Sequence, residues 1–353
     1  MPSVLMNPIR IGRMELKNRI VLAPMGVTIG NMTASTVEYF VERAKGGAAM
    51  LFCNIKGSAT FESADHSIYF CPETEPLFRQ VVERCHAYGC KVGAQIMPGD
   101  GRIGGPSTKY KTPISASASP WLHVPKLLCH PLTVEEIHQI EADYRESVKA
   151  AVRCGADCIE IHAYGGYLTD QFLTARWNTR EDEYGGSVEK RARFLKELID
   201  ICKDEGGRDF PIIVKYTPDH YMDGEGYRKI EEGIELTKLL VSYGVDALHI
   251  DAGCHENWYN AMPPAGMQAM TPQSRSAKII KSIVDIPVLT HGRFGDVKKA
   301  EAALNNDVCD IAVIGRGLLA DPDLPNRVRD GRPDLIRPCI SCNEGCIGRA
   351  FAG

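Results

Sequence analysis

Eight short apolar runs, separated by segments of helical periodicity, constrain the fold of this 353-residue chain more than any other feature. The runs are continuous rather than alternating, which indicates strands buried on both faces. They lie at residues 19–25, 49–57, 91–97, 158–163, 212–217, 247–253, 287–292 and 311–316. Helical patterns cover residues 73–89, 133–155, 188–205, 229–244, 271–284 and 296–306, and several end at glycine, the usual C-cap residue.

This strand–helix alternation predicts an α/β protein, a (β/α)8 TIM barrel. A doubly wound open sheet gives a similar alternation, but no GxGxxG turn follows the first run. Segment 98–131 is rich in Gly, Pro and Ser, and we expect it to form a lid or wall over the active site. The chain from residue 317 onward leaves the repeat. We therefore predict a barrel over 1–330 and a cysteine-containing extension over 331–353.

Composition restricts the function classes. The net charge of −4 and the lack of a basic run argue against nucleic-acid or membrane partners. No apolar stretch has the roughly 20 residues of a membrane span, and the N-terminus lacks a signal-peptide pattern. Most of the thirteen cysteines lie singly in apolar or helical patterns, as expected of buried thiols in a reducing cytoplasm. We expect a cytoplasmic protein with a small-molecule substrate, and a homo-oligomer is left open.

The last two predicted strands each end in a Gly-Arg pair. Reactive residues of a TIM barrel follow the C-terminal ends of its strands, and the loops after the last two strands commonly bind phosphate. Gly292-Arg293 and Gly315-Arg316 occupy these positions. Glycine lets backbone N–H groups approach phosphate oxygens, and arginine adds a bidentate charge. The alternative is two surface arginines after core strands.

Other polar side chains are predicted to face the same end of the barrel, the mouth formed by the C-terminal ends of the strands. Gln95 on the third strand and Lys215 on the fifth suit the polar edge of a flavin ring, although either alone is an ordinary polar lining. His162 and Tyr167 follow the fourth strand and His255 follows the sixth. A tyrosine with an aligned histidine suits protonation of a carbanion or enolate. Each of these residues alone is more often structural.

The loop after the fourth strand carries a long and specific pattern. It reads IEIH at 159–162, GYL at 166–168, QFL at 171–173, Asn178, Arg180, DEYGGS at 182–187 and Arg191. This run resembles the Old Yellow Enzyme family of NADH:flavin oxidoreductases. The motifs LKNR at 16–19 and APM at 23–25, together with both Gly-Arg pairs, resemble its first strand and its phosphate end. The resemblance covers residues 8–346.

The resemblance implies a flavoenzyme that uses NAD(P)H as the ultimate donor and reduces the C=C bond of an α,β-unsaturated carbonyl compound. Reduced FMN passes a hydride to the β-carbon, and Tyr167 protonates the α-carbon. His162 and His255 would position the carbonyl or tune Tyr167. Gly165 stands where the family commonly has a second substrate-binding residue, so His255 becomes the candidate for that task. FMN would contact Pro24, Met25, Gly57, Gln95, Lys215, Gly292, Arg293, Gly315 and Arg316.

The C-terminal cysteines narrow the branch. By spacing alone, Cys339, Cys342 and Cys346 suit a [4Fe–4S] cluster or zinc. They resemble the iron–sulfur branch that includes 2,4-dienoyl-CoA reductase and bacterial bile-acid and steroid ene reductases. The fourth cysteine of that motif would follow Gly353, and full-length relatives continue into domains for FAD and NAD(P)H. We therefore expect a truncated form whose cluster lacks one ligand.

Two other functions remain open at this point. An oxidative demethylase similar to trimethylamine dehydrogenase needs an aromatic cage for a cation. Trp121, Tyr164, Trp258 and Tyr259 are candidates for that cage. The second alternative is a flavin-carrying electron-transfer subunit without a substrate site. Tyr167 and a mouth lined with histidine favour the ene reductase.

Overall fold

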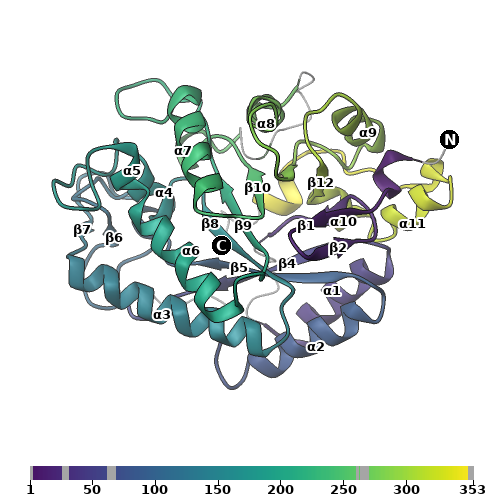
Figure 1. The fold of residues 1–353 in the computed structure, drawn as a ribbon, viewed down its shortest axis with the longest axis horizontal. Coiled ribbons are helices and arrows are strands. Elements are labelled where there is room, and N and C mark those ends of the chain that lie inside the picture. The colour runs from purple at the N-terminus through teal and green to yellow at the C-terminus, as the bar shows by residue number, and fades with distance from the viewer. Residues whose placement is uncertain (1–2, 26–31, 62–68, 260–261, 263–269, 349–353) are drawn as a thin grey trace.

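The computed structural model describes residues 3–25, 32–61, 69–259, 262 and 270–348 (Figure 1). Eight parallel strands form a closed barrel, which confirms the predicted (β/α)8 class. Strands follow one another around the barrel in chain order, and β12 pairs with β3 to close it. The barrel strands are β3 (Ile20–Leu22), β4 (Met50–Lys56), β5 (Lys91–Met97), β8 (Cys158–Ala163), β9 (Ile212–Tyr216), β10 (Ala247–Ile250), β11 (Val288–Thr290) and β12 (Ile311–Ile314).

Helices cover the outside of this barrel (Figure 1). They are α1 (Ala34–Lys45), α2 (Glu75–His86), α3 (Val134–Arg153), α4 (Leu168–Leu173), α5 (Val188–Arg191), α6 (Arg193–Gly206), α7 (Ile230–Ser242), α8 (Pro272–Lys281), α9 (Val297–Asn305), α10 (Arg316–Ala320) and α11 (Leu324–Arg329). The single helix expected over 188–205 is divided at Ala192. The buried Arg191 side chain turns inward there, and its Nε donates to the Leu173 carbonyl at 3.2 Å.

The N-terminal end of the barrel is closed by a hairpin that the apolar runs do not predict. Strands β1 (Ile9–Ile11) and β2 (Met14–Leu16) pair antiparallel. Their inward residues Ile11, Met14 and Leu16 pack against barrel residues such as Phe52 and Leu289. The hairpin therefore closes the N-terminal end of the barrel with apolar side chains, and the polar side chains lie toward the opposite, C-terminal end.

A recurring aspartate fixes the starts of the strands at the same N-terminal end. Asp157, Asp246 and Asp310 directly precede β8, β10 and β12, respectively. Their carboxylates accept backbone N–H groups of the preceding strand, from Val92 at 2.8 Å, Ile212 at 2.9 Å and Val288 at 2.9 Å. These bonds hold the register of neighbouring strands and therefore the relative height of the residues at the mouth.

Segment 98–131 has some regular structure. It contains the 3₁₀ turn Gly101–Ile103 and strand β6 (Ile114–Ser115), which pairs in parallel with β7 (His130–Pro131). The Arg102 guanidinium joins the segment to the loop after β10 through an ion pair with Glu256 at 2.7 Å. Its role as a lid over a substrate stays a prediction.

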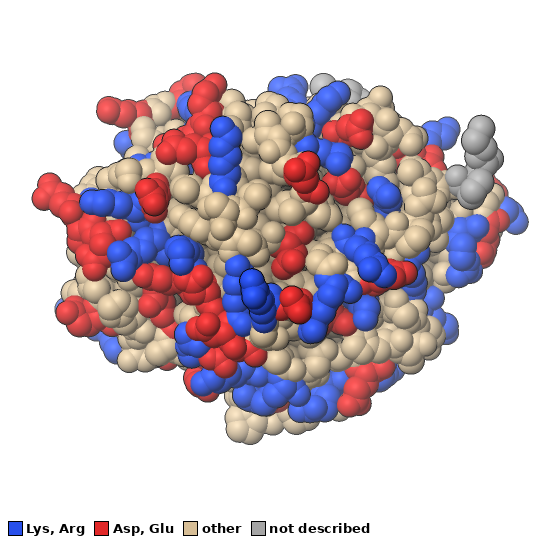
Figure 2. Space-filling model, in the orientation of Figure 1, with Lys and Arg blue, Asp and Glu red and all other residues tan. Residues whose placement is uncertain are grey.

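The face shown in Figure 2 has basic and acidic side chains interspersed, without a broad area of one sign. This distribution fits the small net charge of −4. Within the described ranges, no helix combines the length and the apolar character that crossing a bilayer requires.

Candidate functional site

The barrel interior changes from apolar to polar toward the C-terminal ends of its strands. Polar side chains from β5, β8, β9 and β10 fill this upper layer and are nearly inaccessible to solvent. They are Gln95, Glu160, His162, Lys215 and His249. Buried polar groups are costly unless they are paired or serve a ligand, so this layer is the natural place to look for a cofactor site.

The three residues predicted to be catalytic lie side by side. The His162 and Tyr167 rings are 4.6 Å apart between centroids, in an edge-on arrangement. The Tyr167 and His255 rings are 5.0 Å apart, also edge-on. Tyr167 therefore contacts two imidazoles, one from the end of β8 and one from the loop after β10. The structure brings the three residues together, while their chemical roles remain predictions.

Burial sets the protonation of these rings. It lowers the pKa of His162 to about 3, with a further lowering by the Lys215 charge. It lowers the pKa of His255 to about 4. It raises the pKa of the Tyr167 hydroxyl well above its ordinary value. At neutral pH, the site holds one protonated phenol between two neutral imidazoles.

A buried cation lies beside these rings. The Lys215 ammonium is 3.1 Å from Asp251 and 3.9 Å from the centroid of the Tyr164 ring. Burial opposes the charge on Lys215, but Tyr164 and Asp251 outweigh it and raise the pKa above its ordinary value. Asp251 also faces His291 at 3.4 Å. Lys215 is therefore a permanent positive charge at the mouth.

A chain of hydrogen bonds fixes the orientation of Gln95. Its Nε2 donates to Glu160 Oε1 at 2.6 Å, and the other oxygen of Glu160 accepts from His249 Nδ1 at 2.8 Å. Because the carboxylate accepts from the amide nitrogen, the carbonyl oxygen of Gln95 is left as an acceptor for another group. A flavin ring edge carries both donors and acceptors that suit such an amide.

The loops after β11 and β12 approach each other closely. A Cβ at Gly295 would lie 2.9 Å from the Gly317 Cα, so backbone meets backbone. A Cβ at Gly315 would lie 3.1 Å from the Met25 sulfur, and one at Gly292 would lie 2.4 Å from the Thr271 hydroxyl. These contacts explain the glycines sterically.

The predicted phosphate arginines follow these glycines. Arg293 adopts a left-handed φ of 63°, which is unusual for a residue with a side chain. Arg316 donates to the Asn343 side chain, which joins the mouth to the cysteine segment. These observations describe the backbone of Arg293 and one partner of Arg316. Phosphate binding by the two arginines remains a prediction.

The remaining predicted cofactor contacts differ in environment. Pro24 is buried at the end of β3, and Met25 is partly exposed beside Gly315. Gly57 lies against the outer helix layer, since a Cβ there would lie 2.8 Å from the Tyr144 ring. The packing of α3 explains this glycine without a cofactor, while its carbonyl accepts from Ser147 at 3.1 Å.

The residues present fit a flavin nucleotide. The Nδ1 atom of His162 and the Nε2 atom of His249 are buried without a hydrogen-bond partner among the described residues. Such orphaned atoms are expected where a ligand supplies the missing partner. Gln95 offers an oriented amide, Lys215 a charge for an electron-rich ring edge, and the glycine loops a narrow cradle.

The cysteine segment is less complete. Cys339 and Cys346 are partly exposed and Cys342 is exposed, whereas most other cysteines are buried and all thirteen are free thiols. Within the described ranges, no three His, Cys, Asp or Glu side chains are placed to hold a metal ion. Residues 349–353 of the predicted extension lie outside the described residues. The cluster remains a prediction from spacing.

Several residues of the site were missed at the level of sequence. Glu160, His249 and Asp251 all lie within or next to apolar runs, and a charged residue inside a run of this kind was the available signal. Asp170, His220 and Arg228, which form a buried cluster from α4 and the loop after β9, carried no such signal. Their pairing depends on loops that are distant in sequence.

This combination defines a class of protein, a TIM-barrel oxidoreductase built to hold a flavin at the mouth of its barrel. The chain belongs to the NADH:flavin oxidoreductase / NADH oxidase family, which matches residues 4–335. Family membership makes it a flavin-dependent oxidoreductase and implies FMN as the cofactor.

Individual relatives agree with this assignment. The chain is 38% identical to a cinnamate reductase of Clostridium sporogenes over 98% of its own length and 56% of that protein. It is 35% identical to an NADH oxidase of Thermoanaerobacter brockii over 96% of its length and 52% of that protein. The chain thus spans about half the length of these relatives.

Solved structures show the same architecture. A 2-naphthoyl-CoA reductase in complex with 2-naphthoyl-CoA superposes with a TM-score of 0.88 at 27% identity, covering 99% of this chain and 55% of that chain. An old yellow enzyme homologue from Zymomonas mobilis superposes with a TM-score of 0.76 at 26% identity, covering 94% of each chain.

Proposed function

We propose that the protein is an FMN-dependent ene reductase that acts on a C=C bond conjugated to a carbonyl group. One observation carries the proposal: Tyr167, kept protonated by burial, lies against two neutral histidines at the mouth of the barrel. A protonated phenol in this position can give its proton to a developing carbanion.

When bound, reduced FMN supplies a hydride that forms the new C–H bond at the β-carbon of the substrate. Tyr167 then gives its proton to the α-carbon, and solvent returns a proton to the phenolate. His162 is neutral and offers a ring nitrogen without a partner, so it suits a hydrogen bond to the substrate carbonyl. The Lys215 charge stabilises negative charge that accumulates near it.

Relatives support this choice of substrate class. A cinnamate reductase and a bilirubin reductase of Mediterraneibacter gnavus are among them, the latter 31% identical over 97% of this chain and 54% of that protein. The names of these relatives and the aromatic rings around Tyr167 point to a planar conjugated substrate. We propose an enone, enoate or enoyl thioester.

An amine-oxidising function also has relatives, such as the N,N-dimethylglycine/sarcosine dehydrogenase of Chromohalobacter salexigens at 28% identity over 99% of this chain. The site disfavours it. The Tyr164 face is already occupied by the Lys215 ammonium at 3.9 Å, so a cationic substrate there would meet a like charge. Tyr259 is 59% exposed and does not enclose a cage.

The test is reoxidation of the reduced flavin without oxygen. The chain is loaded with FMN, reduced with dithionite and mixed with 2-cyclohexenone or trans-cinnamate. A separate portion that holds oxidised FMN is mixed with dimethylamine, which an amine dehydrogenase would oxidise with bleaching of the flavin. We expect either unsaturated compound to reoxidise the flavin. Tyr167→Phe should retain FMN and slow that reaction by about 10²- to 10⁴-fold. No reoxidation by any of the unsaturated compounds would overturn the proposal in favour of an electron-transfer subunit.

We also propose that residues 331–353 begin an iron–sulfur segment to which Cys339, Cys342 and Cys346 contribute ligands. The support is their spacing and the contact between Asn343 and Arg316, which places the segment beside the mouth. Anaerobic incubation with iron and sulfide should bind iron with visible sulfur-to-iron absorption. Cys342→Ser should reduce that absorption, whereas Cys309→Ser, which changes a buried thiol, should leave it unchanged.

A further inference from the structure

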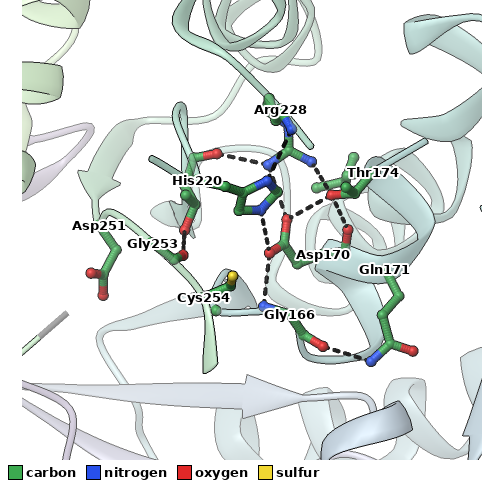
Figure 3. A network of polar contacts seen from close by, with 12 residues as sticks. Gly166, Asp170, Gln171, Thr174, His220, Arg228, Asp251, Gly253 and Cys254 are labelled. Atoms are coloured by element: carbon green, nitrogen blue, oxygen red, sulfur yellow. Dashed lines mark hydrogen bonds and ion pairs between the residues drawn. The ribbon is translucent and has the colours of Figure 1, made fainter. Parts of the chain in front are cut away.

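A buried polar network contacts Gly166, the residue that precedes Tyr167 in the chain (Figure 3). Asp170, His220 and Arg228 form its centre, and their side chains have no exposed surface. The three residues come from helix α4 and from the loop after β9. None of them faces the mouth as a predicted ligand of substrate or cofactor, so the network needs another explanation.

The network binds both the backbone N–H and the backbone carbonyl of Gly166. The Gly166 N–H donates to Asp170 Oδ2 at 2.8 Å, and the Gly166 carbonyl accepts from Gln171 Nε2 at 2.6 Å. Gly165 and Gly166 have φ values of 72° and 84°, a left-handed pair that side chains rarely adopt. The residue after this pair is Tyr167. Consecutive residues of α4 therefore fix the turn from which Tyr167 projects.

Asp170 is itself held from two directions. Arg228 Nη1 donates to Asp170 Oδ1 at 2.9 Å and to the Thr217 carbonyl at 2.7 Å. His220 Nδ1 accepts from the Arg228 N–H at 3.0 Å, so the His220 Nε2–H donates to Asp170 Oδ2 at 3.1 Å. Burial raises the pKa of Asp170, but His220, Arg228 and the Gly166 amide outweigh it and keep that pKa low, at about 2. Asp170 is thus a buried anion with a full set of donors.

The same network reaches the loop that carries His255. Asn257 Nδ2 donates to the His220 carbonyl at 2.8 Å, and Asn257 Oδ1 accepts from the Cys254 N–H at 2.8 Å. His255 follows Cys254 and donates twice to the Gly165 carbonyl, from its backbone N–H at 3.2 Å and from Nδ1 at 3.0 Å. The contacts close into a ring that runs from Gly166 through Asp170, His220 and Asn257 back to Gly165.

We propose that Asp170 is a positioning residue that sets Tyr167 and His255 relative to each other through this closed ring of hydrogen bonds. The proposal rests on the ene reductase function above. A neutral side chain at position 170 would leave Arg228 without its nearest anion, and Glu232, at 3.7 Å, is a poorer partner. The Gly166 peptide would then lose its charged acceptor, and the turn before Tyr167 would relax.

Asp170→Asn tests the proposal because the change keeps the shape and removes the charge. We expect reoxidation of the reduced flavin by 2-cyclohexenone to slow by about 10- to 100-fold, the usual effect of misplacing a reacting group by about 1 Å. FMN affinity should stay within about twofold of the wild type, because Asp170 does not line the predicted cofactor site. The control is Asp310→Asn, which removes a partly exposed carboxylate with a backbone and a lysine partner at the opposite end of the barrel.

The double variant Asp170→Asn/Tyr167→Phe separates positioning from general structural damage. If Asp170 acts through Tyr167, the double variant reacts at the rate of Tyr167→Phe within about twofold. Additive losses in the double variant would overturn the inference, as would an Asp170→Asn protein that reacts as fast as the wild type. A wild type that shows no reoxidation, or a fast Tyr167→Phe, would instead contradict the proposed function.

A second variant serves if Asp170→Asn does not fold. Asn257→Asp keeps the acceptor for the Cys254 N–H and loses the donor to the His220 carbonyl. We expect a slower reoxidation, again without further loss when it is combined with Tyr167→Phe. An Asn257→Asp protein with the wild-type rate would show that the ring does not transmit position between the two loops.

Discussion

The Nδ1 atom of His255 lies 3.0 Å from the carbonyl oxygen of Gly165. Because a carbonyl only accepts, the Nδ1 atom carries the imidazole proton. With a pKa lowered to about 4 by burial, the ring is neutral, so its Nε2 atom is an acceptor at neutral pH. His255 therefore cannot donate a hydrogen bond to a substrate carbonyl from Nε2, and its bond to Gly165 supports the turn before Tyr167.

This geometry predicts a difference between two substitutions of His255. An asparagine amide can reach the Gly165 carbonyl from nearly the place of Nδ1, whereas a glutamine amide mimics Nε2. We expect His255→Asn to keep flavin reoxidation by 2-cyclohexenone within about threefold of the wild type, and His255→Gln to slow it by about 10-fold or more. Stopped-flow absorbance of the flavin measures both rates. Equal losses in the two variants would contradict a role that depends on Gly165.

The buried histidines also predict how the reaction depends on pH. His162 and His255 have pKa values lowered to about 3 and about 4, so neither changes charge between about pH 5 and pH 8. The rate of flavin reoxidation by a neutral enone should be flat across that range. A break near pH 6.5 that is lost in His162→Gln would show that His162 titrates as an ordinary histidine.

Stability should respond to the same two groups. Their pKa values are lower in the folded state than the ordinary histidine value of about 6.5, so the unfolded chain binds more protons below that pH. The contribution of these two histidines to the free energy of unfolding is therefore expected to fall as the pH drops from about 6.5 toward 4. Urea titrations at several pH values measure this, and His162→Gln should show a shallower decline than the wild type.

Glu160 predicts an effect on cofactor binding rather than on proton transfer. Its carboxylate accepts from Gln95 at 2.6 Å and from His249 at 2.8 Å. In Glu160→Gln the amide at position 95 loses its charged anchor, and we expect the dissociation constant of FMN to rise by about 10-fold. Fluorescence quenching of FMN measures the constant. Asp310→Asn is the control for loss of a carboxylate that accepts from a backbone N–H and a lysine, and an equal rise in that variant would assign the effect to the fold.

The sequence was sufficient to predict the barrel and to predict which polar residues lie on its strands. Continuous apolar runs predicted the barrel strands, and the bounds of β5 and β8 agree to the residue. Gln95 and Lys215 were visible because each interrupts such a run. The ends of β10 and β11 were predicted too late in the chain, because the residues that follow Ile250 and Thr290 already belong to loops.

What the sequence could not supply is pairing at a distance. The hairpin β1–β2 consists of two three-residue strands, too short to show a period. In the sequence Asp170 is an ordinary polar residue, because its partners Arg228 and His220 lie 58 and 50 residues further along the chain. The tautomer of His255 likewise depends on Gly165, which only closure of the barrel brings near.

An acidic pair on the outer surface gives the last prediction. Glu141 on α3 faces Glu197 on α6, and burial together with the neighbouring carboxylate raises the pKa of Glu141 to about 8, while Arg193 opposes the shift. An acid whose pKa is raised by folding binds more protons in the folded state than in the unfolded state. The contribution of Glu141 to the free energy of unfolding should therefore decline as the pH rises from about 4.5 to 8, opposite in sign to the contribution of the two buried histidines.

Glu141→Gln removes this effect because glutamine stays neutral. We expect its melting temperature to exceed that of the wild type at pH 8 and above, and the two to converge near pH 5, where Glu141 is protonated in the folded protein. Thermal melts followed by circular dichroism make the comparison. Glu146→Gln on the same helix is the control, since Glu146 is exposed and pairs with Lys149 at 2.7 Å. A control that gains as much at pH 8 would attribute the gain to net charge rather than to the pair, because both substitutions remove one negative charge from the molecule.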